Sequence, residues 1–386
     1  MNRRSALRNL VSLAAASPLI AAPDGTVYPT SYAKEVMGPI NLHEFEPIAR
    51  QKLHKLAYDF IAGGVEDEQT LRGNREALER TFLVPRVMTD VTQVDTSVEL
   101  LGKKMDWPII LAPTGGKNLV IRDGDMIAAR GAAAVNCTYC VAGAPVDKLV
   151  DEGIKLDFWR NTIGSSTKSA AQSYARRCED DGASAILVTV DNQYQSNRDR
   201  NNRNRFDYGY MSTGVPDSER APRAPAVAAM WQPHTPNMTW EVMTWPKGAA
   251  KLPVIIKGVL HPEDAALCVQ HGADALVVSN HGGRQLDGAL PTIVALPDCV
   301  QAVGGKIPVL MDGGIRRGND VVKALALGAS AILIGRPYVW GLASFGQVGV
   351  QRVVELLRAE LKLALALAGQ SSLKSLNPAM VKRLNW

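Results

Sequence analysis

The sequence predicts an α/β fold in which eight parallel strands and the helices between them close into a barrel, the (β/α)8 or TIM-barrel architecture. Short apolar runs rich in β-branched residues alternate with longer segments whose apolar residues recur at helical spacing, which is typical of parallel βα units. Eight such runs favour a closed barrel over an open sheet. The connection between Asp191 and Pro253 is far longer than an ordinary βα loop and predicts a mobile lid at about 206–245.

The eight predicted strands share an apolar centre, and residues that commonly interrupt strands follow most of them. They span residues 107–113, 137–143, 156–160, 184–191, 252–258, 274–280, 307–314 and 330–337. Helical patterns lie between them at 123–135, 167–183, 261–273 and 317–329. The last three of these patterns end on Gly-Ala directly before the next strand, where a glycine commonly terminates a helix.

The N-terminal segment differs from the rest of the chain. An arginine pair at 3–4 precedes an alanine-rich apolar stretch, a layout typical of an export signal of the twin-arginine type. We therefore expect residues 1–22 to direct export to the periplasm, residues 23–40 to form a linker and residues 41–386 to form the barrel. The apolar stretch is too short to span a bilayer permanently. The alternative interpretation is an amphipathic N-terminal helix of a cytoplasmic protein.

The composition argues against several other kinds of protein. The net charge of +5 is spread along the chain, and the densest basic stretch, 198–205, has no aromatic residue to stack on a base, so no nucleic-acid partner is expected. The five cysteines are scattered through apolar segments and do not suggest a disulfide framework. Cys137 and Cys140 have the spacing of a redox pair, but on a strand they face opposite sides, roughly 10 Å apart. We expect both to be buried, and no metal site is predicted.

Polar residues gather at the predicted ends of strands four to eight. In barrel enzymes the chemistry lies at the C-terminal ends of the strands, so these residues form the candidate site. They are Thr189 and Asp191; Lys257; Ser279, His281 and Arg284; Asp312, Gly313, Gly314 and Arg316; and Gly335 and Arg336.

The last two strand ends predict a phosphate site. "DGGIRRG" after the seventh strand and "GRP" after the eighth supply glycine amides and arginines where barrels commonly bind phosphate. Lys257 closes the apolar run "PVIIK" and needs a group that offsets its charge. A Schiff base, a structural ion pair and the stabilisation of an anion such as a reduced flavin are all consistent with this lysine.

These motifs together resemble the FMN-dependent 2-hydroxy-acid oxidases and dehydrogenases, which include glycolate oxidase, lactate oxidase and mandelate dehydrogenase. The resemblance rests on "SNHGGRQLDG", "DGGIRRGNDVVKALALGA", "IGRP", "VIIKGV" and "ILVTVD", and it extends from about residue 41 to the C-terminus. It implies FMN as cofactor and the oxidation of a 2-hydroxy acid to a 2-oxo acid.

The resemblance also implies a role for each site residue. His281 would take a proton from the substrate, and Asp191 would stabilise the protonated imidazole. Arg284 and Arg198 would bind the substrate carboxylate, and Lys257 would stabilise negative charge on the reduced flavin. The remaining residues implied to contact the cofactor are Pro113, Thr114, Gly115, Asn161, Thr189, Ser279, Asp312, Gly313, Gly314, Arg316, Gly335 and Arg336.

The chain departs from the family pattern on the substrate side. Phe60 and Ile163 stand where the family usually has two tyrosines, Asn161 replaces a glutamine, and Ala142 a serine. We interpret Phe60 and Ile163 as the wall of a site for a larger, more apolar substrate than glycolate or lactate. Alternatively, Tyr139, Tyr194 or a lid residue supplies the missing hydroxyl, or the protein binds flavin and turns over poorly.

Further expectations concern partners and alternative functions. Gly115, a position where oxidases of the family often carry alanine and dehydrogenases glycine, favours a quinone or cytochrome over oxygen as electron acceptor. The resemblance implies a homo-tetramer. Alternative functions are a flavin-binding protein of low or no activity, and an FMN enzyme that acts on an amine or a modified peptide.

Overall fold

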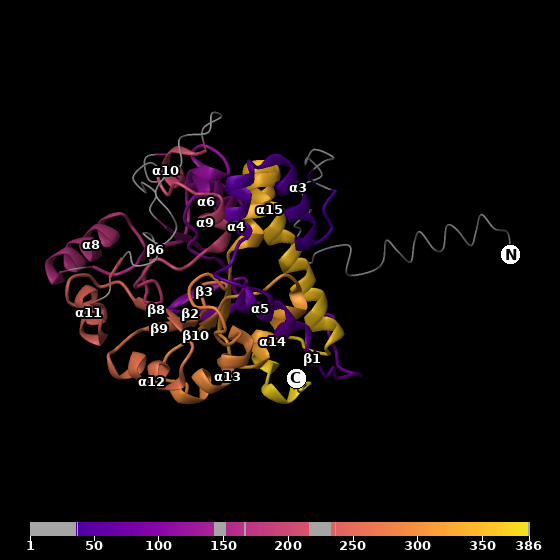
Figure 1. The fold of residues 1–386 in the computed structure, drawn as a ribbon. Coiled ribbons are helices and arrows are strands. Elements are labelled where there is room, and N and C mark those ends of the chain that lie inside the picture. Colours follow the sequence, from indigo (N-terminus) through magenta and orange to yellow (C-terminus); the bar gives the residue numbers. More distant parts are fainter. Residues whose placement is uncertain are drawn as a thin grey trace.

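The predicted barrel is present in the computed structural model, which describes residues 36, 38–142, 152–165, 167–215, 233–235 and 237–384. Eight parallel strands form one closed sheet, and each strand pairs with its neighbours in sequence (Figure 1). The strands are β4 (Ile109–Leu111), β5 (Tyr139–Val141), β6 (Phe158–Thr162), β7 (Ala185–Thr189), β8 (Val254–Val259), β9 (Ala275–Val278), β10 (Val309–Met311) and β11 (Ala331–Ile334). The prediction of eight strands and of closure is confirmed.

Helices cover the outside of the barrel, and the four predicted helical patterns are confirmed (Figure 1). The four predicted helices are α6 (Gly124–Ala134), α8 (Lys168–Asp180), α12 (Pro262–Gln270) and α14 (Gly318–Ala326). Two further helices on the outside are α13 (Thr292–Val303) and α15 (Arg336–Leu367). The last of them bends at Phe345 and Gly346, where the backbone leaves helical geometry. No helix in the described part of the chain is long and apolar enough to span a bilayer.

Alternating strand residues build two apolar layers. Ile109 and Leu111 of β4 pack outward among the helices, whereas Ile110 packs inside the barrel. Cys137 belongs to the outer layer and Cys140 to the barrel interior, and both thiols are free and buried. The predicted opposite orientation of this pair is confirmed, because successive side chains of a strand point to opposite faces.

Elements before the barrel cover its two ends and one side. They are η1 (Leu42–Glu44), α3 (Phe45–Lys52), α4 (Lys55–Ala62), α5 (Gln69–Glu79), β1 (Thr81–Leu83), β2 (Val98–Leu100) and β3 (Lys103–Met105). The β2–β3 hairpin places Leu100 against the apolar cluster inside the barrel and so closes one end of the barrel. β1 pairs with β12 (Val381–Arg383), a strand near the C-terminus. The short helices η5 (Leu373–Ser375) and η6 (Pro378–Met380) precede β12 in the chain.

The connection between β7 and β8 is long, as predicted. It contains α9 (Asp199–Arg203), α10 (Tyr210–Thr213), α11 (Trp240–Thr244) and η4 (Trp245–Gly248). Residues 216–232 and 236 of the predicted lid lie outside the described residues. The predicted export signal and most of the predicted linker lie outside them as well.

Candidate active site

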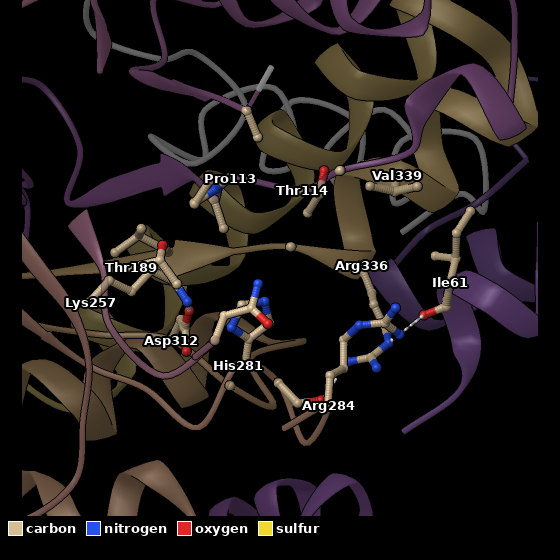
Figure 2. A pocket seen from close by; sticks show the side chains of 18 of the residues that line it. Ile61, Pro113, Thr114, Thr189, Lys257, His281, Arg284, Asp312, Arg336 and Val339 are labelled. Atoms are coloured by element: carbon tan, nitrogen blue, oxygen red, sulfur yellow. Dashed lines mark hydrogen bonds and ion pairs between the residues drawn. The ribbon is translucent and has the colours of Figure 1, made fainter. Parts of the chain in front are cut away.

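A cavity of about 490 Å³ opens at the C-terminal ends of the barrel strands. That volume lies within the usual range for cofactor sites. Figure 2 shows Lys257, His281, Arg284, Asp312 and Arg336 around it, and they belong to strands β8 to β11 or to the segments that follow them. Other predicted site residues that line it are Phe60, Pro113, Thr114, Gly115, Asn161, Ile163, Thr189, Arg198, Gly313, Gly314, Arg316 and Gly335. Asp191 and Ser279 do not line the cavity but bond to residues that do.

The turn that carries His281 is held in an unusual conformation. His281, Gly282 and Gly283 all have left-handed backbones, with φ values of 57°, 65° and 73°. This conformation is strained for a histidine, and it persists only where the surroundings enforce it. A Cβ atom at Gly283 would lie 2.5 Å from the backbone nitrogen of Leu71, so only glycine permits this close packing on α5.

Helix α5 holds this turn through side-chain amides. Asn74 and Asn280 donate to each other's Oδ1 atoms at 2.9 and 2.8 Å, and both side chains are buried. The Asp287 carboxylate accepts from the backbone N–H groups of Gln69 and Thr70 at 3.1 and 2.8 Å. This role of Asn74 was not predicted, because a lone polar residue on a helix carries no pattern that identifies its partner.

His281 and Asp191, to which the family resemblance assigns the roles of base and supporting carboxylate, are in direct contact. His281 Nδ1 lies 2.8 Å from Asp191 Oδ1. Gly258 makes room for this carboxylate, because a Cβ atom there would lie 2.6 Å from Asp191 Cγ. Burial lowers the pKa of His281 below its usual 6.5, and Asp191 opposes this shift. The imidazole is therefore a neutral base at pH 7, with a carboxylate placed to stabilise its charged form.

Lys257 is buried at the back of the cavity and is held by two groups. Its Nζ atom lies 3.0 Å from Ser279 Oγ and 3.2 Å from Asp312 Oδ2. Burial acts to lower the pKa of Lys257, but Asp312 and Asp191 outweigh it and raise the pKa above the usual value. A Schiff base requires a neutral amine, so this environment favours a permanent cation.

The resemblance implies that Ser279 contacts the cofactor directly, but this serine does not line the cavity. Its side chain is fully buried, and its hydroxyl also accepts from the His281 N–H at 3.1 Å. The serine connects Lys257 to the His281 turn. Ser279 directly follows β9. It lies behind Lys257 and His281, which both face the cavity, and holds them by hydrogen bonds.

Two partly buried arginines flank the aromatic ring of Phe60. The Arg284 and Arg198 guanidinium carbons lie 5.2 and 5.9 Å from the ring centroid. Arg284 donates to the Gly63 carbonyl at 2.6 Å, and Arg198 donates to Ser196 Oγ at 2.9 Å. Neither forms an ion pair with a carboxylate in the described ranges. Burial, followed by the charges of neighbouring arginines, lowers the pKa of Arg284 well below its usual value.

Two further arginines line the same cavity, and Arg336 lies beside Arg284, since both donate to the Gly63 carbonyl. Arg336 donates to the carbonyls of Ile61, Gly63 and Gly282, each at 2.9 Å (Figure 2). Arg316 donates to the carbonyl of its neighbour Ile315. Burial lowers the pKa of each arginine to about 10. Arg336 is the first residue of α15, where backbone N–H groups and the helix dipole favour an anion.

These charges and unsatisfied atoms fit a phosphorylated cofactor and a carboxylate substrate. Cations drawn away from water without a carboxylate partner are costly unless an anion binds beside them, and here four such arginines line one cavity. Asp312 Oδ1 is buried without a hydrogen-bond partner among the described residues. It can accept from a hydroxyl of a sugar-like chain bound in the cavity. The donor set therefore suits FMN.

The Asn161 amide is oriented by a neighbouring strand. Thr189 donates its hydroxyl to Asn161 Oδ1 at 2.7 Å, which leaves the amide NH2 group to face the cavity. Asn161 therefore offers hydrogen-bond donors, as a longer glutamine would, from the third strand of the barrel.

The structure separates the tyrosines that could replace the missing substrate hydroxyls. Tyr139 donates to Asp125 Oδ1 at 3.0 Å in the buried outer layer, and neither Tyr139 nor Tyr194 lines the cavity. Tyr208, in the long connection after β7, does line it. The Tyr208 ring lies 6.2 Å from the Phe60 ring, which Arg198 and Arg284 also contact.

Several cavity residues were not predicted individually from the sequence. The long connection contributes Asn192, Gln195, Ser196, Tyr208, Met211 and His234, and α15 contributes Pro337 and Val339. The connection has no periodic pattern, so only its length indicated that it would contact the site.

The barrel and its cavity define an enzyme that binds a phosphorylated cofactor and a small carboxylate substrate. The chain matches the family model described as FMN-dependent dehydrogenase over residues 49–383. It belongs to this family and is an FMN-dependent enzyme that oxidises 2-hydroxy acids.

Curated relatives and solved structures agree with this assignment. The chain is 40% identical to the peroxisomal (S)-2-hydroxy-acid oxidase of Oryza sativa subsp. japonica over 86% of this chain and 92% of the relative. It is 36% identical to the L-lactate oxidase of Nostoc sp., over 90% and 99%. A solved structure of mandelate oxidase with (S)-2-phenylpropionate matches at a TM-score of 0.79 and 36% identity, covering 90% of this chain and 98% of that chain.

Proposed function

We propose that the enzyme oxidises a 2-hydroxy acid with a larger, more apolar side chain than glycolate or lactate, of the size of an aryl group. The observation that carries this proposal is the lining of the cavity beside the arginine pair. Phe60, Ile163 and Met211 provide apolar surface there. The solved mandelate oxidase structures with (S)-2-phenylpropionate and benzoyl-formic acid show that relatives accept aryl compounds.

The proposed chemistry assigns each residue a task. Arg198 and Arg284 bind the substrate carboxylate by charge-assisted hydrogen bonds. His281 takes the proton of the substrate hydroxyl, and Asp191 stabilises the resulting imidazolium. When bound, FMN would supply the acceptor for the Cα hydrogen and the two electrons of the oxidation, and Lys257 would offset the negative charge of the reduced ring.

Tyr208 completes the carboxylate site in this proposal. Its hydroxyl accepts from Asn201 Nδ2 at 3.3 Å, so its own proton is free to be donated to a ligand. Its ring stands edge-on to Phe60, with centroids 6.2 Å apart. A residue of the long connection thus supplies the hydroxyl that neither Phe60 nor Ile163 can offer.

An anaerobic panel tests the substrate. Glycolate, lactate, mandelate, phenyllactate and a long-chain 2-hydroxy acid are mixed with the FMN-loaded enzyme, and bleaching of the flavin absorbance is followed. We expect mandelate and phenyllactate to give the highest values of kcat/KM. Preference for glycolate would refute the apolar substrate, and turnover of amines alone would refute the hydroxy-acid assignment.

We further propose a quinone or cytochrome as electron acceptor. A Cβ atom at Gly115 would lie 2.9 Å from Met211 Cε, so the flexible Met211 side chain occupies the space that an alanine methyl group would need. Reoxidation of the reduced enzyme by oxygen and by a quinone is compared in stopped flow. Oxygen as the faster acceptor, as the names of the oxidase relatives suggest, would refute this proposal.

We also propose twin-arginine export and a homo-tetramer. The arginine pair and apolar stretch within residues 1–22 support export, since a flavoprotein folds around its cofactor before crossing. The exposed apolar side chains of Val84, Val87 and Met88 give a surface that further subunits would cover. Periplasmic fractionation with mass determination of the mature N-terminus tests the first, and light scattering tests the second.

A further inference from the structure

Lys117 is a fully buried lysine that the proposed chemistry does not use. It follows the cavity-lining segment 113–115, and its side chain is 0% exposed. The Nζ atom lies 2.7 Å from Asp125 Oδ1. Burial lowers the pKa of Lys117, and Asp125 opposes that shift. A buried ion pair contributes little net stability, because desolvation offsets much of the attraction.

The Lys117 ammonium group also donates to the backbone carbonyl of Thr114. That carbonyl belongs to the peptide that joins Thr114 to Gly115. In a planar trans peptide the C=O and N–H bonds point in opposite directions, so the Gly115 N–H points away from Lys117. Both residues line the cavity, and the Gly115 N–H has no hydrogen-bond acceptor in the described part of the chain.

The same peptide is held from a second side. The hydroxyls of Tyr338 and Thr114 hydrogen-bond to each other, and Tyr338 also donates to the Ala112 carbonyl at 2.9 Å. Tyr338 lies in the first turn of α15, two residues after Arg336. The Thr114 segment is therefore fixed by α15 on one side and by the Lys117–Asp125 pair on the other.

We propose that Lys117 is a positioning residue for the cofactor: it fixes and polarises the Thr114–Gly115 peptide, so that the Gly115 N–H is donated into the cavity as a strengthened hydrogen-bond donor to the FMN ring. The inference rests on the proposed function and on the cofactor contact that the resemblance implies for Thr114 and Gly115. A cation bound to the carbonyl oxygen withdraws electrons from the peptide, and charge-assisted hydrogen bonds are about twice as strong as neutral ones. The reduced ring carries more negative charge and gains most, so Lys117 raises the reduction potential.

The test separates polarisation from a purely structural role. Lys117→Met removes the cation, and Lys117→Met combined with Asp125→Asn removes the whole buried pair without leaving a lone carboxylate. Lys247→Met is the matched control, because Lys247 also binds a backbone carbonyl, that of Gly272, and a carboxylate, Asp274 at 3.0 Å. Lys247 does not line the cavity.

Three quantities are measured for each FMN-loaded variant: the dissociation constant for FMN, the melting temperature and the two-electron reduction potential. We expect both Lys117 variants to lower the equilibrium constant for flavin reduction about five- to tenfold, a tenfold change being about 30 mV for two electrons. The control keeps the wild-type potential even if its melting temperature falls.

Two results would overturn the inference. One is a wild-type potential in the double variant with FMN still bound, which would make the buried pair structural only. The other is an equal fall in the Lys247→Met control. Failure of the proposed function is distinguishable from both, because wild-type protein would then bind no FMN or would not be bleached by any hydroxy acid.

Discussion

Replacing Tyr208 by phenylalanine removes one hydroxyl at the arginine pair and little else. The ring contacts with Phe60 and Phe206, at centroid separations of 6.2 and 5.5 Å, do not involve the phenol oxygen and are kept. If the hydroxyl donates to the substrate carboxylate, it contributes one hydrogen bond to a charged group, about 1.5 to 3 kcal/mol. The expected loss in kcat/KM is therefore about 10- to 150-fold.

Anaerobic stopped-flow reduction by mandelate separates binding from chemistry in this variant. We expect the apparent Kd for mandelate to rise while the dissociation constant for FMN stays unchanged, since Tyr208 lies beside the substrate arginines. Tyr210→Phe is the matched control, because Tyr210 packs edge-on to Phe206 with centroids 5.8 Å apart but does not line the cavity. A kcat/KM for Tyr208→Phe within twofold of the wild type, or an equal loss in the control, would refute the assignment.

Three further predictions concern the base, its titration and the phosphate end. His281→Gln is expected to lower the rate of flavin bleaching by about 10²–10⁴-fold while FMN stays bound, checked by stopped flow and absorbance, because the substrate proton loses its acceptor. Since burial lowers the pKa of His281, kcat/KM should stay level above pH 6.5 and fall only on the acidic side of it, and a pH profile with its acidic limb above 6.5 would contradict this. Arg316→Met should weaken FMN binding by about 1.5 to 3 kcal/mol, measured by fluorescence titration of the apoprotein, and an unchanged affinity would place the phosphate elsewhere.

The apolar runs and strand-end residues were sufficient to predict the barrel and one side of the site. A strand that is buried on both faces needs a continuous apolar run, and its length and spacing are visible in the sequence. Lys257, His281 and Asp312 could be placed together because parallel strands of a barrel bring their C-terminal ends to one face.

The roles of individual polar side chains depended on contacts between distant segments. Asn74 and Asn280 are 206 positions apart, and Lys117 contacts the peptide before Gly115 only because the chain turns back on itself. A hydrogen bond requires an approach of about 3 Å, which the packing of whole elements decides and no local pattern encodes.

The fold class and the gathering of functional residues at the strand ends could be predicted from the amino-acid sequence, because periodicity and strand order are local properties repeated along the chain, whereas the role of His281 as base comes from the family resemblance. The three-dimensional packing was needed to establish that Tyr208, and not Tyr139 or Tyr194, lines the cavity with the arginine pair. It also placed Phe60 between Arg198 and Arg284, and Ser279 behind Lys257. A side chain's chemistry in a site follows from its direction and its neighbours, and both are set by packing across the whole barrel.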